Sequence, residues 1–500
     1  MNSLGAKSLS AVFWGTGGAM VRLLLQFGAQ VILARLLGPE QYGLFAIGAI
    51  VISFSNFFSD IGLAYGLIQK PSVTGRDIRF VFTWQIILGL AVSTAIALSS
   101  GKIASFFGDD RAAGIVQVLA IICLLNALAA PSMNLLKRDL DFRRIQLFQI
   151  SSFILGYITV GIPLALLGSQ VWALVAAWVT QALVMLLLLY RATRHPLQPL
   201  IHYEDAKALS GYGAIVLITN LINWLINNID RVIIGRFFDN REIGLYATTY
   251  NMLLTPTTSL LGIVQPVFFS ASARLSGDKA VIASSYRALI AAVAVFLLPA
   301  FVAVSAVSET FVLAVYGPKW IEATHLFAPL ALAMPLYLIW GFTTPLLWTG
   351  GHASREFKVQ LPLAIVWASA CWLAAQHSVV AVAWTVLALF LARCLLIIGT
   401  AAHYLALEKC ALWRAVRGGI VCSLLIGFVV TSIDRLVGPL PAITKLMIDA
   451  LVGACALLLA LRLLPFVIPP ELATLNGRIL GKMPPAIAAR FAFLGKLGAV

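Results

Sequence analysis

The sequence predicts an all-α protein that crosses a membrane about fourteen times. Hydrophobic residues make up 61% of the 500 residues, charged residues only 11%, and the mean hydropathy is +0.95. Soluble globular chains carry about 25% charged residues, so this chain has too few to cover a surface that faces water. Apolar runs of about 20 residues, the length of a spanning helix, follow one another with short breaks. Because these runs are continuous and do not alternate with polar residues, a membrane β-barrel is excluded.

The first apolar run starts soon after Lys7 and continues to Leu37 without a small-residue cleavage motif, so we interpret it as a spanning helix and not as a signal peptide. The expected spans lie near 12–37, 43–68, 80–101, 112–135, 147–168, 170–190, 211–235, 243–270, 286–307, 325–350, 359–377, 379–404, 414–433 and 443–464. Prolines inside the eighth and tenth spans predict helix breaks that could act as hinges. They are Pro256, Pro266, Pro329, Pro335 and Pro345.

The net charge of +15 is explained by the positions of the basic residues. With the N-terminus in the cytoplasm, the predicted cytoplasmic segments carry more than twice as many Lys and Arg residues as the opposite side. This bias predicts an even number of spans, with both the N- and the C-terminus cytoplasmic. No soluble segment combines a Lys/Arg-rich block with interleaved aromatic residues, so we expect no nucleic acid partner.

A polar stretch divides the chain into two predicted lobes. The expected organisation is an N-lobe of six spans (1–190), a cytoplasmic linker or interfacial helix (191–210), a C-lobe of six spans (211–404), two further spans (405–464) and a cytoplasmic tail (465–500). No loop is long enough to hold a soluble catalytic domain.

Sequence motifs for catalysis or metal binding are absent. The chain has no GxxxxGK[ST] motif, which excludes a fused ATPase motor. None of its six cysteines forms a CxxC pair, and its histidines are scattered without metal-ligand spacing. We therefore expect a non-enzymatic protein with neither a cofactor nor a metal ion.

A shift of 201 residues places two stretches of the chain on each other. The run Val31–Arg35 falls on Val232–Arg236. In the same register, Gly43–Ala46 falls on Gly244–Ala247. Chance explains matches among Val, Ile and Leu, but Arg and Gly matches in one register favour an internal duplication. Six spans separate the copies, so the halves have the same orientation, as in transporters built from parallel repeats.

Polar residues form a stripe on one helix face in the first and in the seventh span. In the first span, Arg22, Gln26 and Gln30 recur at steps of four. The 201-residue shift places these three on Asn223, Asn227 and Arg231. The duplication therefore predicts equivalent polar stripes on equivalent helices of the two lobes.

Four further polar residues complete the set of candidate binding residues: Asn56, Asp60, Asp230 and Arg393. A charged residue such as Arg22 costs about 2.5–3.5 kcal/mol at the centre of a bilayer on insertion scales, so we expect these side chains to line a hydrophilic cavity. A guanidinium group suits a phosphate anion, and amides suit sugar hydroxyls. The alternatives are a buried Arg22–Asp60 ion pair, amides that join helices, and a structural role for Asp230 and Arg231 near a helix end.

At three places the chain resembles the polysaccharide-biosynthesis branch of the multidrug/oligosaccharidyl-lipid/polysaccharide exporter superfamily, the Wzx-type flippases. These places are ARLLGPEQYGLFA (34–46), SDIGL (59–63) and NNIDRVIIGRFFDNREIGLYATTYNM (227–252). Length and motifs look most like the colanic acid, succinoglycan and xanthan exporter subgroup. The resemblance covers the first twelve spans and implies two six-helix bundles that form a V, with two extra C-terminal helices.

The resemblance also implies a function. A Wzx-type flippase moves an undecaprenyl-pyrophosphate-linked sugar repeat unit across the bacterial inner membrane, by alternating access of its two lobes. Its partners would be the lipid-linked oligosaccharide, inner-membrane lipid, and, as further candidates, a polysaccharide polymerase and a chain-length regulator. Arg22 and Asp60 match cavity-lining charges of the first lobe. Asp230 matches the aspartate of the family pattern in which Asp-x-x-x-x-Gly is followed by a Gly-x-Tyr motif, here Gly244 to Tyr246.

Three other functions are weighed against this one. A cation-coupled multidrug antiporter of the same superfamily needs a carboxylate ion site, for which Asp60 and Asp230 are at hand. A lipid II flippase would be expected to carry more cations in its first-lobe cavity than Arg22 alone. A membrane-embedded polymerase or glycosyltransferase should have a large loop with catalytic acids, which this chain lacks.

Overall fold

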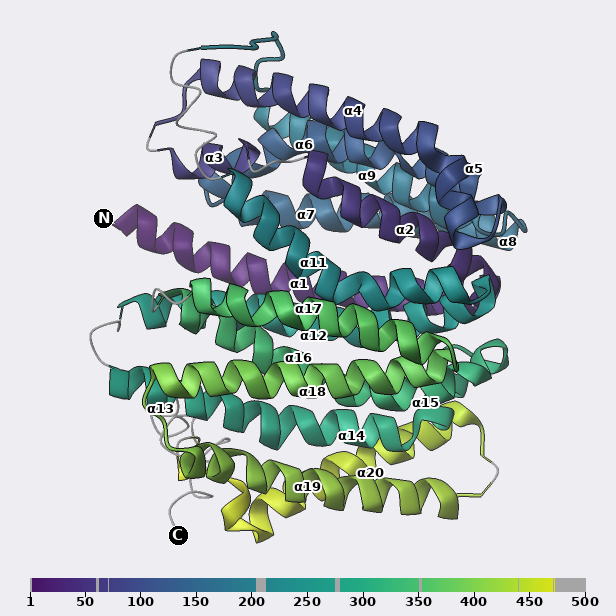
Figure 1. Ribbon diagram of the computed structural model, residues 1–500, viewed down its shortest axis with the longest axis vertical. Coiled ribbons are helices and arrows are strands. Elements are labelled where there is room, and N and C mark those ends of the chain that lie inside the picture. The colour runs from purple at the N-terminus through teal and green to yellow at the C-terminus, as the bar shows by residue number, and fades with distance from the viewer. Residues whose placement is uncertain are drawn as a thin grey trace. The chain divides into compact units, whose positions relative to one another are not determined.

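The computed structural model describes residues 2–59, 63–70, 72–203, 213–274, 279–349, 353–438, 440–470 and 472. In these residues the regular structure is helical throughout (Figure 1). The chain packs into two units: unit 1 comprises Met1–Thr248 and Cys371–Val379, and unit 2 comprises Thr249–Ala370 and Val380–Val500. Unit 1 therefore includes the seventh predicted span together with the first six, and the division into lobes by the internal repeat stays a prediction.

Unit 1 begins with the long helix α1 (Asn2–Leu37), and the chain then turns at Gly38, whose φ of 80° lies in the left-handed region that favours glycine. The helices that follow are α2 (Pro39–Ser59), α3 (Leu63–Gln69), α4 (Gly75–Phe107), α5 (Arg111–Leu119), α6 (Ile121–Arg138), α7 (Phe142–Phe153), the π-helical segment η1 (Ile154–Gly161), α8 (Ile162–Leu166), α9 (Trp172–Thr193), α11 (Gly213–Phe237) and the start of α12 (Asn240–Arg274).

Unit 2 continues α12 and contains the remaining helices, whose colours run from teal through green to yellow in Figure 1. These are α13 (Lys279–Ala292), the π-helical segment η3 (Val293–Leu297), α14 (Leu298–Ala306), α15 (Ser308–Val315), the 3₁₀ helix η4 (Pro318–Ala323), α16 (Thr324–Thr349), α17 (Ala353–Ala375), α18 (Val379–Tyr404), α19 (Lys409–Leu436), α20 (Ala442–Leu463) and η5 (Pro465–Val467). The last residues of α17 pack with unit 1.

The prediction of an all-helical, multi-pass membrane protein is confirmed. Each of the fourteen predicted spans falls on one helix or on consecutive helices. Eleven helical segments of the described chain are long and apolar enough to cross a membrane. The described side chains of α17 add a shorter apolar helical segment, Gln360–Ala375.

Two helices that were predicted to break at prolines are continuous, so that prediction is wrong. The helix α12 runs unbroken through Pro256 and Pro266. The helix α16 likewise runs through Pro329, Pro335 and Pro345. In a membrane protein, packing against neighbouring helices compensates for the hydrogen bond that a proline removes, and α16 is largely buried inside unit 2.

The predicted linker 191–210 is described as far as Tyr203 and is extended after Arg194. It lies along the first turns of α4, where Arg79 Nε donates to the Gln198 carbonyl at 3.1 Å and Trp84 Nε1 to the Ile201 carbonyl at 3.1 Å. In this part the linker is a non-helical segment whose backbone carbonyls accept hydrogen bonds from side chains of α4, and not an interfacial helix. The predicted tail lies outside the described residues after Leu472.

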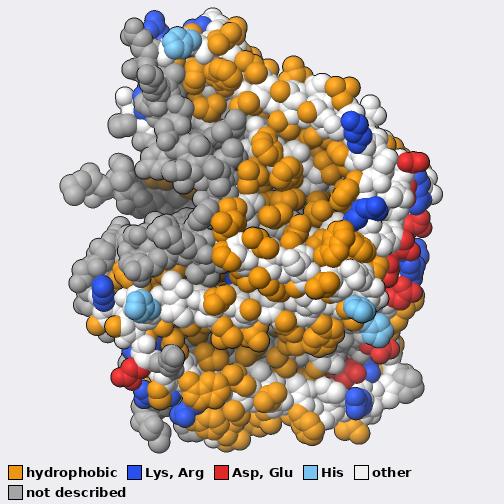
Figure 2. Space-filling model, viewed as in Figure 1, with side chains coloured by type: hydrophobic (Ala, Val, Ile, Leu, Met, Phe, Trp, Pro, Cys, Tyr) orange, Lys and Arg blue, Asp and Glu red, His pale blue; other side chains and the backbone are white. Residues whose placement is uncertain are grey.

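The surface has the character expected of a protein surrounded by lipid. Figure 2 shows hydrophobic side chains over broad areas of the visible face, with charged side chains gathered towards its edges. Leu98, Leu424 and Phe428 are each at least 70% exposed. Lipid is as apolar as these side chains, so the helices are held together by close van der Waals packing and by polar contacts.

Candidate functional site

The polar stripe of α1 meets the helix α7. Arg22 is partly buried, and its Nη1 donates a hydrogen bond of 2.5 Å to Gln149 Oε1. One turn earlier on α1, Gly18 packs against the side chain of Gln146, so the two helices touch closely. Gln26 and Gln30 are partly buried on the same face of α1. This face of α1 is therefore continued by the glutamines of α7.

The partner predicted for Arg22 in an ion pair, Asp60, lies outside the described residues. On the same helix α2, Asn56 accepts a hydrogen bond of 3.3 Å from Asn126 of α6. Ser53 accepts one of 3.0 Å from the indole of Trp224, which comes from α11. The polar residues of α2 thus join α6 and α11 within unit 1. This arrangement fits the alternative in which the amides join helices.

The polar stripe of α11 is bonded along its own helix. Asn227 Nδ2 donates to the Asn223 carbonyl at 2.8 Å, and Arg231 Nη1 donates to Asn228 Oδ1 at 3.3 Å. The side-chain oxygen of Asn223 is buried and has no hydrogen-bond partner in the described structure. It is an acceptor that a ligand hydroxyl or a water molecule could satisfy.

Asp230 is 2% exposed and does not pair with Arg236. Its Oδ2 accepts a hydrogen bond of 2.5 Å from the hydroxyl of Tyr246, the tyrosine of the Gly-x-Tyr motif in α12. This bond joins two motif residues across the turn between α11 and α12. The other carboxylate oxygen is buried and has no partner among the described residues.

Arg393 lies in unit 2 and is completely buried in α18. Its Nη2 donates to Gln360 Oε1 of α17 at 2.9 Å, and its guanidinium lies 3.7 Å from the ring centroid of Trp340 in α16. A cation over an aromatic ring in a desolvated site is stabilised by about 2 kcal/mol. Arg393 therefore binds three helices of unit 2 together.

The two stretches matched by the internal repeat touch each other. Gly43 and Gly244 occupy the fifth positions of α2 and α12. A Cβ atom at Gly43 would lie closer than 3.0 Å to the Asn240 carbonyl oxygen, and one at Gly244 would lie equally close to the carbonyl oxygen of Pro39. Pro39 and Asn240 are themselves equivalent under the 201-residue shift. We call this reciprocal approach the glycine contact.

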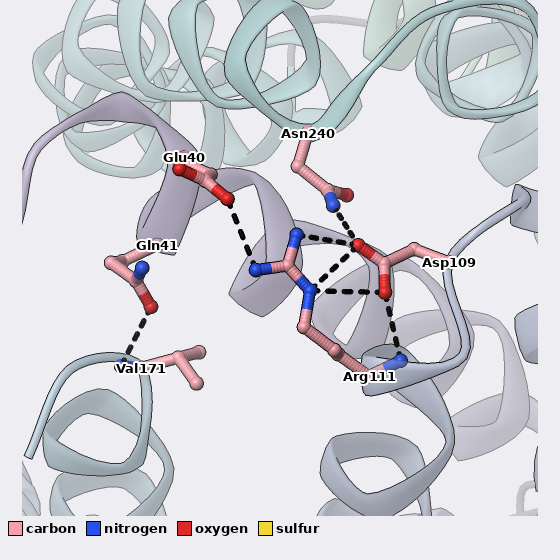
Figure 3. Close-up of polar contacts among 6 residues, drawn as sticks. All are labelled: Glu40, Gln41, Asp109, Arg111, Val171 and Asn240. Atoms are coloured by element: carbon pink, nitrogen blue, oxygen red, sulfur yellow. Dashed lines mark hydrogen bonds and ion pairs between the residues drawn. The ribbon is translucent and has the colours of Figure 1, made fainter.

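Charged residues lie beside Asn240, whose carbonyl oxygen takes part in the glycine contact (Figure 3). Arg111, at the start of α5, pairs with Asp109 at 2.8 Å and with Glu40 at 3.0 Å. Asp109 also accepts a hydrogen bond from Asn240. Partial burial alone would raise the pKa of Asp109, but the hydrogen bonds from Arg111 and Asn240 outweigh burial and hold the pKa below its ordinary value. The network ties the first turns of α2, α5 and α12 together.

An apolar cavity of about 900 Å³ lies between α2, α4 and α11. Its walls include Phe54 and Phe58 of α2, Phe106 of α4 and Trp224 of α11, and Lys102 is the charged residue among its lining side chains. None of the candidate binding residues that the structure describes lines it. This cavity is suited to hydrocarbon and not to sugars.

Sequence reasoning missed the partners of the predicted residues, above all Gln149, Tyr246 and Gln360. Gln146 and Gln149 carry a signal, because they stand three residues apart in a predicted span, on one helix face. The pairing of Arg393 with Gln360 joins residues 33 positions apart, and no spacing rule reveals such a contact.

Comparison with known proteins places the chain in a family. The model of the polysaccharide biosynthesis protein family matches residues 32–325. The chain belongs to this family, whose members are membrane transporters and not enzymes. The matched region contains both stretches of the internal repeat except Val31.

Three relatives describe the family further. The chain is 23% identical over 324 residues to the lipopolysaccharide biosynthesis protein WzxC of Escherichia coli (strain K12), covering 64% of this chain and 65% of that protein. It is 23% identical over 391 residues to the teichuronic acid biosynthesis protein TuaB of Bacillus subtilis (strain 168), covering 77% and 80%. It is 24% identical over 309 residues to the succinoglycan biosynthesis transport protein ExoT of Rhizobium meliloti (strain 1021), covering 62% of each. The match thus spans less than two thirds of WzxC and of ExoT.

Solved structures with the same fold include the lipid II flippase MurJ in an inward closed conformation, with a TM-score of 0.71 at 11% identity over 89% of this chain and 96% of MurJ. An inward-facing multidrug resistance MATE transporter of the MOP superfamily gives a TM-score of 0.60 at 14% identity over 77% of this chain and 94% of that protein. Identities this low show the fold alone. The chain is thus a member of the polysaccharide biosynthesis protein family that shares its fold with these two transporters.

Proposed function

We propose that this protein flips a polyprenyl-pyrophosphate-linked oligosaccharide repeat unit across the bacterial inner membrane, for the synthesis of exopolysaccharide or lipopolysaccharide. Two lobes related by the internal repeat would give alternating access to the two sides of the membrane. The substrate class is supported by the family and by its relatives WzxC and ExoT, named for lipopolysaccharide biosynthesis and succinoglycan transport.

The observation that carries the proposal is the position of Arg22. It lies within a membrane-spanning helix, partly exposed, and is held by a neutral glutamine rather than by a carboxylate in the described structure. A guanidinium group whose positive charge is not cancelled by this partner keeps its charge for a ligand anion such as pyrophosphate. The neighbouring amides of α1 and α7 offer donors and acceptors to sugar hydroxyls.

The variant Arg22→Ala tests the assignment. In a strain whose own exporter gene is deleted, it should lower polymer export about ten- to a hundredfold, because a hydrogen bond to a charged group contributes about 1.5–3 kcal/mol. Lipid-linked repeat units should accumulate in the inner membrane. The matched control is Arg414→Ala on α19, an exposed arginine outside the predicted duplicated core, which should export normally. Normal export by Arg22→Ala, at an unchanged protein level in the membrane, would remove Arg22 from the mechanism.

The same strain separates the competing functions. Expression of the wild-type protein should restore polymer export without raising resistance to drugs and without replacing an essential lipid II flippase. Drug resistance would favour the antiporter, and rescue of a strain depleted of its lipid II flippase would favour that activity instead.

We infer that both termini face the cytoplasm. In that topology Ser72, between α3 and α4, faces the cytoplasm, and Asp110, between α4 and α5, faces the opposite side. A membrane-impermeant thiol reagent added to intact cells should label Asp110→Cys above the wild-type background and leave Ser72→Cys unlabelled. The reverse pattern would invert the topology.

A further inference from the structure

A buried carboxyl group without a hydrogen-bond partner lies in α20. Asp449 is 2% exposed, and neither of its carboxyl oxygens has a hydrogen-bond partner in the described part of the chain. It stands about 10 Å along the helix from Ala442, where α20 begins, at a rise of 1.5 Å per residue. Burying an ionised carboxylate without partners costs several kcal/mol. This position therefore needs an explanation.

A second carboxyl group lies beside it. Asp434, near the end of α19, is an acidic neighbour of Asp449. Its Oδ1 pairs with Lys445 Nζ at 3.1 Å and accepts a hydrogen bond of 2.7 Å from the hydroxyl of Thr310 in α15. Asp434 is thus satisfied by a cation and a hydroxyl, whereas Asp449 has no ion pair in the described structure and faces the carboxyl group of Asp434.

The charges of the cluster do not balance when both carboxyl groups are ionised. Two negative charges then face the single positive charge of Lys445, which stands one turn before Asp449 on the same face of α20. The other titratable groups at this end of the packed helices, Glu309 of α15 and Arg435 of α19, are exposed. The helix α14 and η5, which also pack against α20, carry no titratable residue.

We propose that the Asp434–Asp449 pair is a proton-binding site and that Asp449 takes up the proton at mildly acidic pH. The neutral acid removes the excess negative charge and the cost of a buried, unpartnered carboxylate. When the proton leaves to water, one uncompensated charge remains where α20 packs against α15 and α19. The packing of α20 is thereby linked to protonation. This inference does not rest on the proposed function.

Infrared difference spectroscopy of the full-length protein in lipid nanodiscs tests the proposal. The wild-type protein should show a protonated carboxyl band at mildly acidic pH that is absent from Asp449→Asn and retained in the matched control Glu309→Gln, which removes the nearby exposed carboxylate. A band of unchanged size in Asp449→Asn would overturn the proposal. So would loss of the wild-type band on adding sodium ions at constant pH, because that result assigns the site to a metal cation.

A second variant keeps the test decisive if Asp449→Asn does not fold. Asp434→Asn removes the neighbouring negative charge and frees Lys445, so Asp449 should lose its proton at a pH lower by about one unit or more, a tenfold or greater fall in proton affinity. A band that disappears at the wild-type pH, or at a higher one, would contradict a shared site.

Discussion

The two polar stripes of this protein hold equivalent positions in the internal repeat but make different contacts. On α1, Arg22 donates to Gln149, which lies 127 residues further along the chain on another helix. On α11, Arg231 donates to Asn228 less than one turn back on its own helix. The predicted duplication places polar residues at both sets of positions, and the two stripes differ in the hydrogen bonds that they make.

This difference indicates that the two stripes have different roles. The orientation of a side chain that is bonded to another helix depends on where that helix lies. A side chain that is bonded within its own helix keeps its orientation when that helix moves. We therefore expect the α1 stripe to be sensitive to the packing of α7, and the α11 stripe to act as a fixed polar surface. The predictions below test this contrast, from the largest expected effect to the smallest.

At the glycine contact, the same substitution in either repeat should destabilise the protein equally. Gly43→Val and Gly244→Val each place a side chain on a backbone carbonyl that cannot move away, so each should destabilise the protein by about 3 kcal/mol or more, the upper part of the overpacking range. Thermal unfolding of the purified variants measures the loss. Gly28→Ala and Gly262→Ala are matched controls in α1 and α12, because a methyl group there meets nothing within 4 Å. If only one of the two valine variants is unstable, the contact is not reciprocal.

The partner of Arg22 provides the second test. Gln149→Ala removes the hydrogen bond that orients the guanidinium group, and we expect a loss of about fivefold to tenfold in polymer export, since a net hydrogen bond to a charged group contributes about 1.5 kcal/mol. Asn228→Ala, the equivalent change beside Arg231, should lower export by less than about twofold, because this partly exposed pair lies on one helix. Equal losses in the two variants would remove the contrast between the stripes.

The smallest effect on stability is expected from the carboxyl group of Asp109, which lies beside the glycine contact and makes the effect depend on pH. Because the pKa of Asp109 is held below its ordinary value of 3.8, its contribution to stability is fully present above that value and is lost as the pH falls through the lower pKa of the folded state. Asp109→Asn should therefore lower the Tm near neutral pH, by an amount equivalent to about 1 kcal/mol or less because Arg111 is well exposed. The difference from wild type should shrink in acid. The neighbouring Asp110→Asn is the control, and a difference that stays constant at low pH would contradict the assignment.

Much of the fold could be predicted from the sequence because the bilayer imposes simple rules. Apolar runs give the spans, and the predicted spans fall on the observed helices even where a span consists of several short ones, as at Arg111–Arg138. The prolines of α12 and α16 misled the prediction, because their effect depends on neighbouring helices that a single sequence does not reveal.

The sequence supplies the candidate residues, whose binding role stays a prediction, but it does not reveal their contacts. Helical spacing identifies the stripe that contains Arg22 and the one that contains Arg231, since both follow from the periodicity of one helix. The bond from Arg22 to Gln149 and the bond from Tyr246 to Asp230 depend on which helices pack together. The repeat matches Gly43 to Gly244, so the equivalence of the two glycines could be predicted. The close approach of each glycine to the other's helix could not.

The glycine contact also bears on how the chain arose. Gly43 approaches the carbonyl of Asn240, and Gly244 approaches the carbonyl of Pro39, which is equivalent to Asn240 in the repeat. Such an exchange of equal contacts is the property of an isologous interface between two copies of one subunit related by a two-fold axis. A half-length ancestor could have made the same contact with a second copy of itself. Fusion of two such genes would then have joined a homodimer into one chain, and left each half free to change its own polar stripe.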